Sequence, residues 1–83
     1  MVTILRSGPF RVVIYPGDRE HMPPHVHVFN GEGEVKIAIG DGETAPSVML
    51  VLGMRKPDVR GALRAVEEHQ EACLREWRRY HGW

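Results

Sequence analysis

The placement of proline and glycine divides this chain into two parts with different folding options. All six prolines lie at or before residue 57, and only one of the nine glycines, Gly61, lies inside the segment 57–81. Proline removes a backbone donor and glycine weakens a helix, so both residue types favour turns between short elements. The distribution predicts strands and turns over residues 1–52 and one helix over residues 57–81.

Alternating and β-branched stretches predict where the strands lie. These stretches cover residues 2–5, 10–15, 25–29 and 34–39. A further stretch, residues 47–52, is apolar enough to be a buried fifth strand. Turn-forming residues, such as Asn30-Gly31, stand between the stretches and favour hairpin connections.

Apolar residues recur at helical spacing in the last part of the chain. The stripe, with steps of three and four residues, consists of Val59, Leu63, Val66, Gln70, Cys73, Trp77 and Tyr80. Pro57 suits the first helical turn, and Asp58 complements the positive end of the helix dipole. The whole pattern predicts an α+β fold in a single domain, residues 1–83: a mainly antiparallel sheet of four or five strands packed on one long C-terminal helix.

Composition excludes several classes of protein. Lysine plus arginine and aspartate plus glutamate each number 11, so the formal charge is zero, which excludes a histone-like basic binder and an acidic tail. The longest apolar run, residues 48–52, is far shorter than the ~20 residues that span a membrane. Arg6 and Arg11 interrupt any secretion leader, and the lone Cys73 cannot form an internal disulfide. We therefore expect a cytoplasmic protein with no membrane association and no cofactor.

Strand alternation separates an apolar face from a polar one. The side chains expected to face the helix are Val12, Ile14, Val26, Val28, Val35, Ile37 and Ile39. The side chains expected on the open opposite face are Arg11, Val13, Tyr15, His25, His27, Phe29, Glu34 and Lys36. This open face is where the sequence concentrates its chemically active groups.

His25 and His27, two residues apart on one strand, support three interpretations. They can be structural, stacking on neighbours such as Tyr15. They can act as general base and general acid in metal-independent RNA cleavage, because imidazoles titrate near neutral pH. They can also chelate a metal, which requires a third ligand. In the RNA interpretation, the candidate nucleic-acid contacts are Arg11, Arg19, Lys36 and Tyr15.

Several segments resemble one family of small bacterial proteins. The segments are residues 3–6, residues 10–15, Met22-Pro23-Pro24-His25-Val26-His27-Val28, Leu74-Arg75-Glu76-Trp77 and Tyr80-His81-Gly82. They are similar to the bacterial domain-of-unknown-function family 4160, which has no established activity. Its members are often encoded beside a second small protein, in pairs that look like toxin–antitoxin modules. The resemblance implies that Pro23, Pro24, His25 and His27 form the site.

Three functional hypotheses follow. The leading one is a component of a toxin–antitoxin-like pair that acts on RNA, with His25 and His27 as catalytic residues. The alternative is a non-enzymatic interaction module, an antitoxin or assembly subunit, that uses an exposed strand edge or the Trp77–Tyr80 end of the helix. The third is a metal-binding protein with His25 and His27 as ligands. The expected partners are a protein encoded by the neighbouring gene, RNA, or a second copy of the chain.

Overall fold

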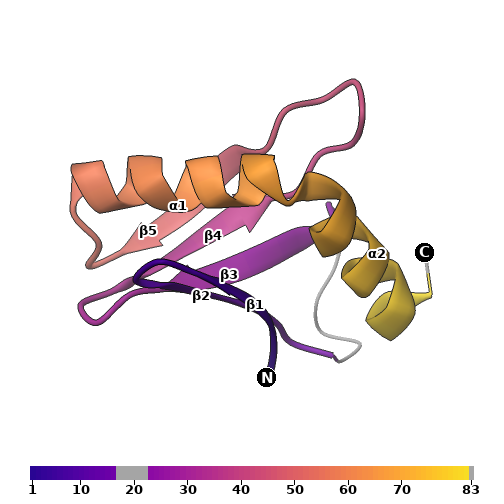
Figure 1. Ribbon diagram of the computed structural model, residues 1–83, viewed down its shortest axis with the longest axis horizontal. Helices are drawn as coiled ribbons and strands as arrows, with labels where there is room; N and C mark the ends of the chain where they lie inside the picture. Colours follow the sequence, from indigo (N-terminus) through magenta and orange to yellow (C-terminus); the bar gives the residue numbers. More distant parts are fainter. Residues whose placement is uncertain (17–22, 83) are drawn as a thin grey trace.

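A five-stranded antiparallel sheet and two helices form the protein, whose computed structural model describes residues 1–16 and 23–82. The elements are β1 (Val2–Ser7), β2 (Phe10–Ile14), β3 (His25–Phe29), β4 (Glu34–Ala38), β5 (Ser47–Leu52), α1 (Lys56–Glu68) and α2 (Gln70–His81). Neighbouring strands in the sheet are also neighbours in sequence, in the order β1-β2-β3-β4-β5. Figure 1 shows α1 lying across one face of this meander, while α2 turns away past the ends of the strands. The α+β fold predicted from the sequence is confirmed.

The hydrophobic core lies between α1 and one face of the sheet. Ala62 and Val66 of α1 are fully buried and belong to the same cluster as Val12, Val28 and Ile37. The predicted assignment of apolar side chains to the helix-facing side is correct, because alternate residues of a strand point to opposite faces.

β5 exists, but the expectation that it is buried is wrong. Its apolar side chains, Val48 to Leu52, are 40–52% exposed. β5 is the last strand of the sheet, and within the described residues no further strand pairs with its outer edge. Its apolar composition therefore does not reflect burial inside this chain.

The single long helix predicted over residues 57–81 is divided in two. The break is at His69, whose backbone leaves helical geometry (φ −121°, ψ 27°) between α1 and α2. The His69 N–H donates to the Val66 carbonyl at 3.2 Å, a bond that tightens the last turn of α1. Neither helix in the described part of the chain is long and apolar enough to cross a membrane.

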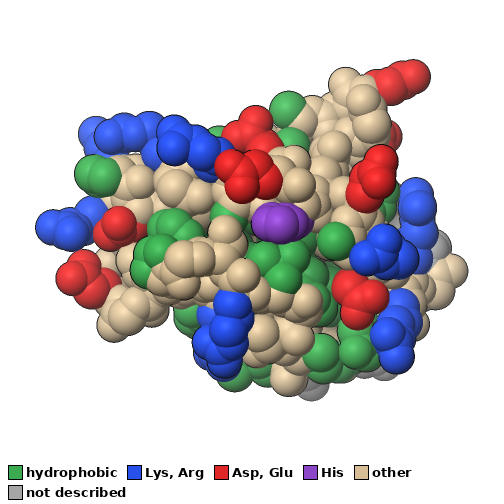
Figure 2. Space-filling model, viewed as in Figure 1, with side chains coloured by type: hydrophobic (Ala, Val, Ile, Leu, Met, Phe, Trp, Pro, Cys, Tyr) green, Lys and Arg blue, Asp and Glu red, His purple; other side chains and the backbone are tan. Residues whose placement is uncertain are grey.

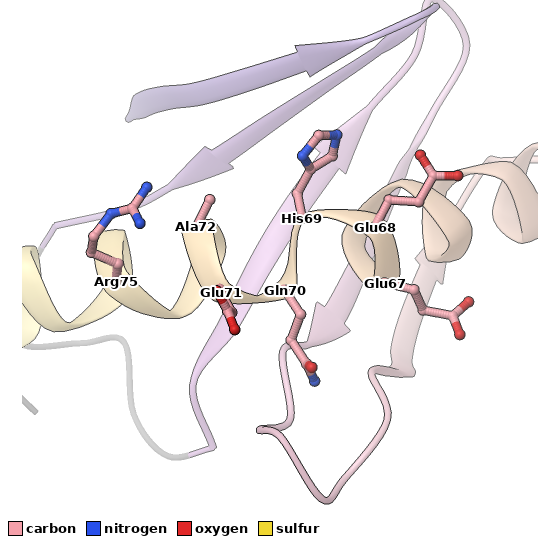
Figure 3. Close-up of a pocket in the computed structure, with 7 residues that line it drawn as sticks. All are labelled: Glu67, Glu68, His69, Gln70, Glu71, Ala72 and Arg75. Carbon is pink, nitrogen blue, oxygen red and sulfur yellow. The ribbon is translucent and has the colours of Figure 1, made fainter.

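Gln70 explains why the break occurs where no proline or glycine interrupts the helix. Its side-chain amide donates to the carbonyls of Ile39 and Thr44, both at 2.9 Å. Figure 3 shows Gln70 and His69 pointing to opposite sides of the junction, with Gln70 directed towards the loop after β4. The amide thereby ties the start of α2 to that loop, and α2 departs in a new direction.

The loop between β4 and β5 is held in one shape by its own backbone. Asp41 Oδ1 accepts hydrogen bonds from the N–H groups of Glu43 (2.9 Å) and Thr44 (2.8 Å). These bonds favour the carboxylate and lower the pKa of Asp41 below its usual 3.8. Asp41 therefore stays charged, and the loop presents acidic groups beside the start of β5.

Burial of Cys73 is expected to make the protein sensitive to alkali. Desolvation raises the pKa of the Cys73 thiol from 9.0 to about 11. In the unfolded chain the thiol ionises first, so stability is complete below pH 9 and falls as pH rises towards 11. The loss is roughly 2 kcal/mol by pH 11.

Urea unfolding of the wild type and of Cys73→Ala across this pH range measures the effect. The wild type is expected to lose more stability than the variant, because other alkaline titrations are common to both. Equal losses in the two proteins would show that the thiol is not desolvated.

Candidate functional site

The sheet face opposite α1, here called the distal face, arranges its side chains in cross-strand rows. One row runs from Arg6 of β1 through Arg11, Phe29 and Glu34 to Leu52 of β5. The next row contains Val13, His27, Lys36 and Leu50. The distal face thus brings together most of the candidate site residues that the sequence placed on one face.

His25 lies on the distal side of β3 but is not open to solvent, so the expectation of an exposed histidine pair is wrong at this residue. It is only 2% exposed, and its ring lies 5.0 Å from that of Trp77 in α2. Its Nδ1 donates to the Pro23 carbonyl at 2.9 Å. Because His25 is buried, a substrate has no direct path to it in this structure. Val13, also expected on the open face, is fully buried too.

His27 is held by a carboxylate and an aromatic ring. Its Nδ1 donates to Glu34 Oε2 at 2.8 Å, and the two side chains are 12% and 25% exposed. The Tyr15 ring stands edge-on to the imidazole with ring centres 4.5 Å apart. A carboxylate bonded to Nδ1 fixes the tautomer and orientation of an imidazole, as in sites where histidine acts as a base. Glu34 was not among the predicted catalytic residues, although its position on the same face is visible in the alternation.

Two arginines lie side by side at the β1 end of the distal face. Arg6 and Arg11 are register partners on β1 and β2, and the Arg11 guanidinium sits 5.4 Å from the centre of the Phe29 ring. Like charges directly opposite each other destabilise a sheet unless an anion neutralises them. Arg6 was missed at the sequence level, because only the register reveals that it faces Arg11.

Lys36 and Arg19 are the two remaining candidate nucleic-acid contacts. Lys36 is the register partner of His27, so it joins the same row. Arg19 lies outside the described residues. Within residues 1–16 and 23–82, no group of three or more side chains of the kinds that bind metals comes together. The third ligand that a His25–His27 metal site requires is therefore not supplied by this part of the chain.

A model for one protein family, described as a domain of unknown function (DUF4160), matches residues 10–78. The chain belongs to this family. No curated protein and no solved structure matches it. The DUF4160 match covers all of β2 to α1 and most of α2, so the break at His69 and the edge strand β5 both lie within the family domain.

The Pro-Pro-His-Val-His segment of this DUF4160 domain has a clear structural role. The Pro24 carbonyl accepts a hydrogen bond from the Ile39 N–H at 2.9 Å, and the Pro23 carbonyl accepts one from His25. Both prolines also line a surface pocket of about 490 Å³ against Leu74 of α2. The segment therefore joins β3 to β4 and to α2.

Proposed function

We propose that the protein is a non-enzymatic interaction module whose working surface is the outer edge of β5. One observation carries the proposal: five consecutive apolar side chains, residues 48–52, are 40–52% exposed on the last strand of the sheet. A small monomer rarely exposes a contiguous apolar patch of this kind without a binding role. An exposed strand edge can also extend its sheet with a strand from a partner.

The two faces of β5 both favour binding of an added strand. Register places Leu50 and Leu52 on the distal side, beside Lys36 and Glu34. The side chains opposite Val35 and Ile37, on the α1 side, are Val51 and Val48. A partner strand therefore finds apolar neighbours on both faces, in addition to the backbone groups at the edge.

The opposite edge of the sheet differs from β5 and serves as an internal comparison. β1 exposes the polar residues Thr3 and Arg6. Both edge strands have one irregularity in their pairing, β1 between Thr3 and Leu5 and β5 opposite Lys36 and Ile37, so the two edges differ in their side chains. Polar and charged side chains on an edge strand are a usual means of preventing edge-to-edge association. β5 carries no charged residue from Ser47 to Leu52. The contrast supports β5, and not β1, as the surface that binds.

This function corresponds to the antitoxin or assembly-subunit role in a toxin–antitoxin-like pair. The buried position of His25 supports the non-enzymatic role over cleavage by a histidine pair, because a general acid or base must reach the proton that it transfers. Membership of the DUF4160 family is compatible with this role, but the description of the family names no function.

Leu50→Glu tests the proposal, with Thr3→Glu on the opposite edge as the matched control. Glutamate at position 50 lies beside Lys36, so the variant retains a favourable cross-strand pair. Self-association and co-purification with the product of the neighbouring gene are both measured. At least one is expected to be lost in Leu50→Glu and kept in Thr3→Glu. If neither interaction depends on residue 50, the proposal is wrong.

A second candidate function is RNA binding on the distal face, favoured by the adjacent Arg6 and Arg11. Guanidinium groups and aromatic rings such as Phe29 are the groups that contact phosphates and stack on bases in single-stranded RNA. His27, held by Glu34, is the side chain that a cleavage step would use. The net charge of zero argues against tight, sequence-independent binding.

The arginine pair and His27 give separate tests of this candidate. Arg6→Ala combined with Arg11→Ala is expected to weaken RNA binding and to flatten its salt dependence. His27→Ala is expected to abolish any cleavage while leaving binding in place. RNA binding that survives loss of both arginines would exclude the distal face as the RNA surface.

A further inference from the structure

The edge formed by β5 and α1 carries opposite charges at its two ends. The exposed basic residues near the end of β5 and the start of α1 are Arg55, Lys56 and Arg60. The exposed acidic residues near the start of β5 and the end of α1 are Asp41, Glu43 and Glu67. Figure 2 shows basic side chains over the first half of α1, with some acidic side chains beside them at that end, and further acidic side chains at the far end of α1 and on the protruding loop. This edge therefore has more basic residues at one end, more acidic residues at the other, and apolar side chains at its centre.

We propose that β5 pairs antiparallel with β5 of a second copy of the chain, around a two-fold axis at the middle of the strand. This inference rests on the proposed function and identifies the partner. A two-fold axis brings the basic end of each copy against the acidic end of the other. Parallel pairing would instead place like charges together, so the charge pattern selects the antiparallel arrangement.

The spacing of the flanking charges is symmetric about β5. Glu43 lies four residues before Ser47, and Lys56 lies four residues after Leu52. An antiparallel pair centred between Met49 and Leu50 therefore places the loop that carries Glu43 of each copy at the same end of the paired strands as Lys56 of the other. Arg55 already lies 3.7 Å from Glu32 and 3.6 Å from Asp58, so Lys56 is the better probe of this arrangement.

The apolar centre of the strand is also self-complementary. In the same register Val48 opposes Val51 of the other copy, and Met49 opposes Leu50. Each pair joins apolar side chains that are 40–51% exposed in the single chain. Pairing would remove them from water and join two five-stranded sheets into one. A second copy therefore satisfies the backbone edge, the apolar centre and the charged ends together.

Light scattering during size-exclusion chromatography, over a range of concentrations of the full chain, tests the inference. The wild type and Thr3→Glu are expected to be dimers. Leu50→Glu places two carboxylates close to the two-fold axis and is expected to raise the dimer dissociation constant at least about tenfold. Circular dichroism checks that each variant keeps its fold.

Exchanging the charges of Glu43 and Lys56 tests the antiparallel arrangement of the two β5 strands. Glu43→Lys and Lys56→Glu are each expected to weaken the dimer by about threefold to tenfold, as loss of a favourable charge pair and gain of a repulsive one require. The double variant restores opposite charges across the interface and is expected to recover wild-type association. The antiparallel pairing would be contradicted if the single variants dimerised as tightly as the wild type, or if the double variant dimerised more weakly than either single variant.

The failure of this inference can be distinguished from failure of the proposed function. In one outcome, the wild type is monomeric at all concentrations while Leu50→Glu no longer co-purifies with the product of the neighbouring gene. That result would contradict the dimer but would support β5 as an interaction surface for another protein. A dimer insensitive to Leu50→Glu overturns the inference and places the self-interface elsewhere.

Discussion

Replacement of Trp77 by alanine is expected to lower the free energy of unfolding by about 3–5 kcal/mol, a large part of the stability of a small domain. Trp77 is 1% exposed, and the centre of its ring lies 5.0 Å from that of His25 in β3 and 3.9 Å from that of His81. Removing the indole leaves a cavity where α2 packs against the end of β3. Thermal unfolding is expected to shift down by at least about 12 °C.

Trp77→Phe is the matched control, because it keeps an aromatic ring in the same space. Trp77→Phe is expected to lower the free energy of unfolding by less than half as much as Trp77→Ala does. If the two variants were equally stable, the packing of the indole against His25 would not hold α2 in place. Faster chemical modification of His25 in Trp77→Ala, measured on the folded fraction, would show that Trp77 is what covers that histidine.

Gly33→Ala is the second substitution expected to have a large effect. A Cβ at this position would lie 2.5 Å from the carbonyl carbon of Gly53 and 2.6 Å from the Met54 backbone nitrogen. Both are backbone atoms, so the turn before β4 and the turn after β5 would have to separate. We expect a loss of about 2–4 kcal/mol in urea unfolding, at or above the usual range for overpacking.

Gly31→Ala, two residues earlier in the same turn, is the matched control. No atom lies within 4 Å of a Cβ built at Gly31, so this variant is expected to unfold within about 0.5 kcal/mol of the wild type. A Gly33→Ala protein as stable as Gly31→Ala would show that the two turns do not touch. Because the contact anchors the end of β5, Gly33→Ala is also expected to weaken any association through that strand.

Local periodicity was sufficient to predict the faces of the inner strands. The two-residue alternation in β3 and β4 correctly assigned Val26, Val28 and Val35 to the core, where all three are fully buried. It also placed His27, Glu34 and Lys36 together on the other face, as the register confirms. These features depend only on neighbours in the chain, and for that reason they are visible in the sequence.

The features that the sequence did not predict depend on residues far apart in the chain. The helix break depends on hydrogen bonds from Gln70 to Ile39 and Thr44, which are 31 and 26 residues away. The burial of His25 depends on Trp77 at the other end of the domain. Alternation gives the side of a strand on which a residue lies, but not what covers it.

The exposure of β5 follows from its position in the sheet and not from its composition. An apolar strand between two others would be buried, whereas the same residues on the last strand of a meander are half exposed. Evolution of a monomer would favour a charge or a proline there. The five exposed apolar residues of β5 are the surface that the proposed partner would cover.

Hydrogen exchange at the backbone amides of β5 tests most directly whether this strand is an interaction surface. In a complex, the amides on its outer edge form hydrogen bonds across the interface and exchange slowly. We expect their protection to fall on dilution and in Leu50→Glu, while the amides of β1 are unchanged. Outer-edge amides of β5 that exchange rapidly at every concentration, with or without the neighbouring gene product, would contradict the account.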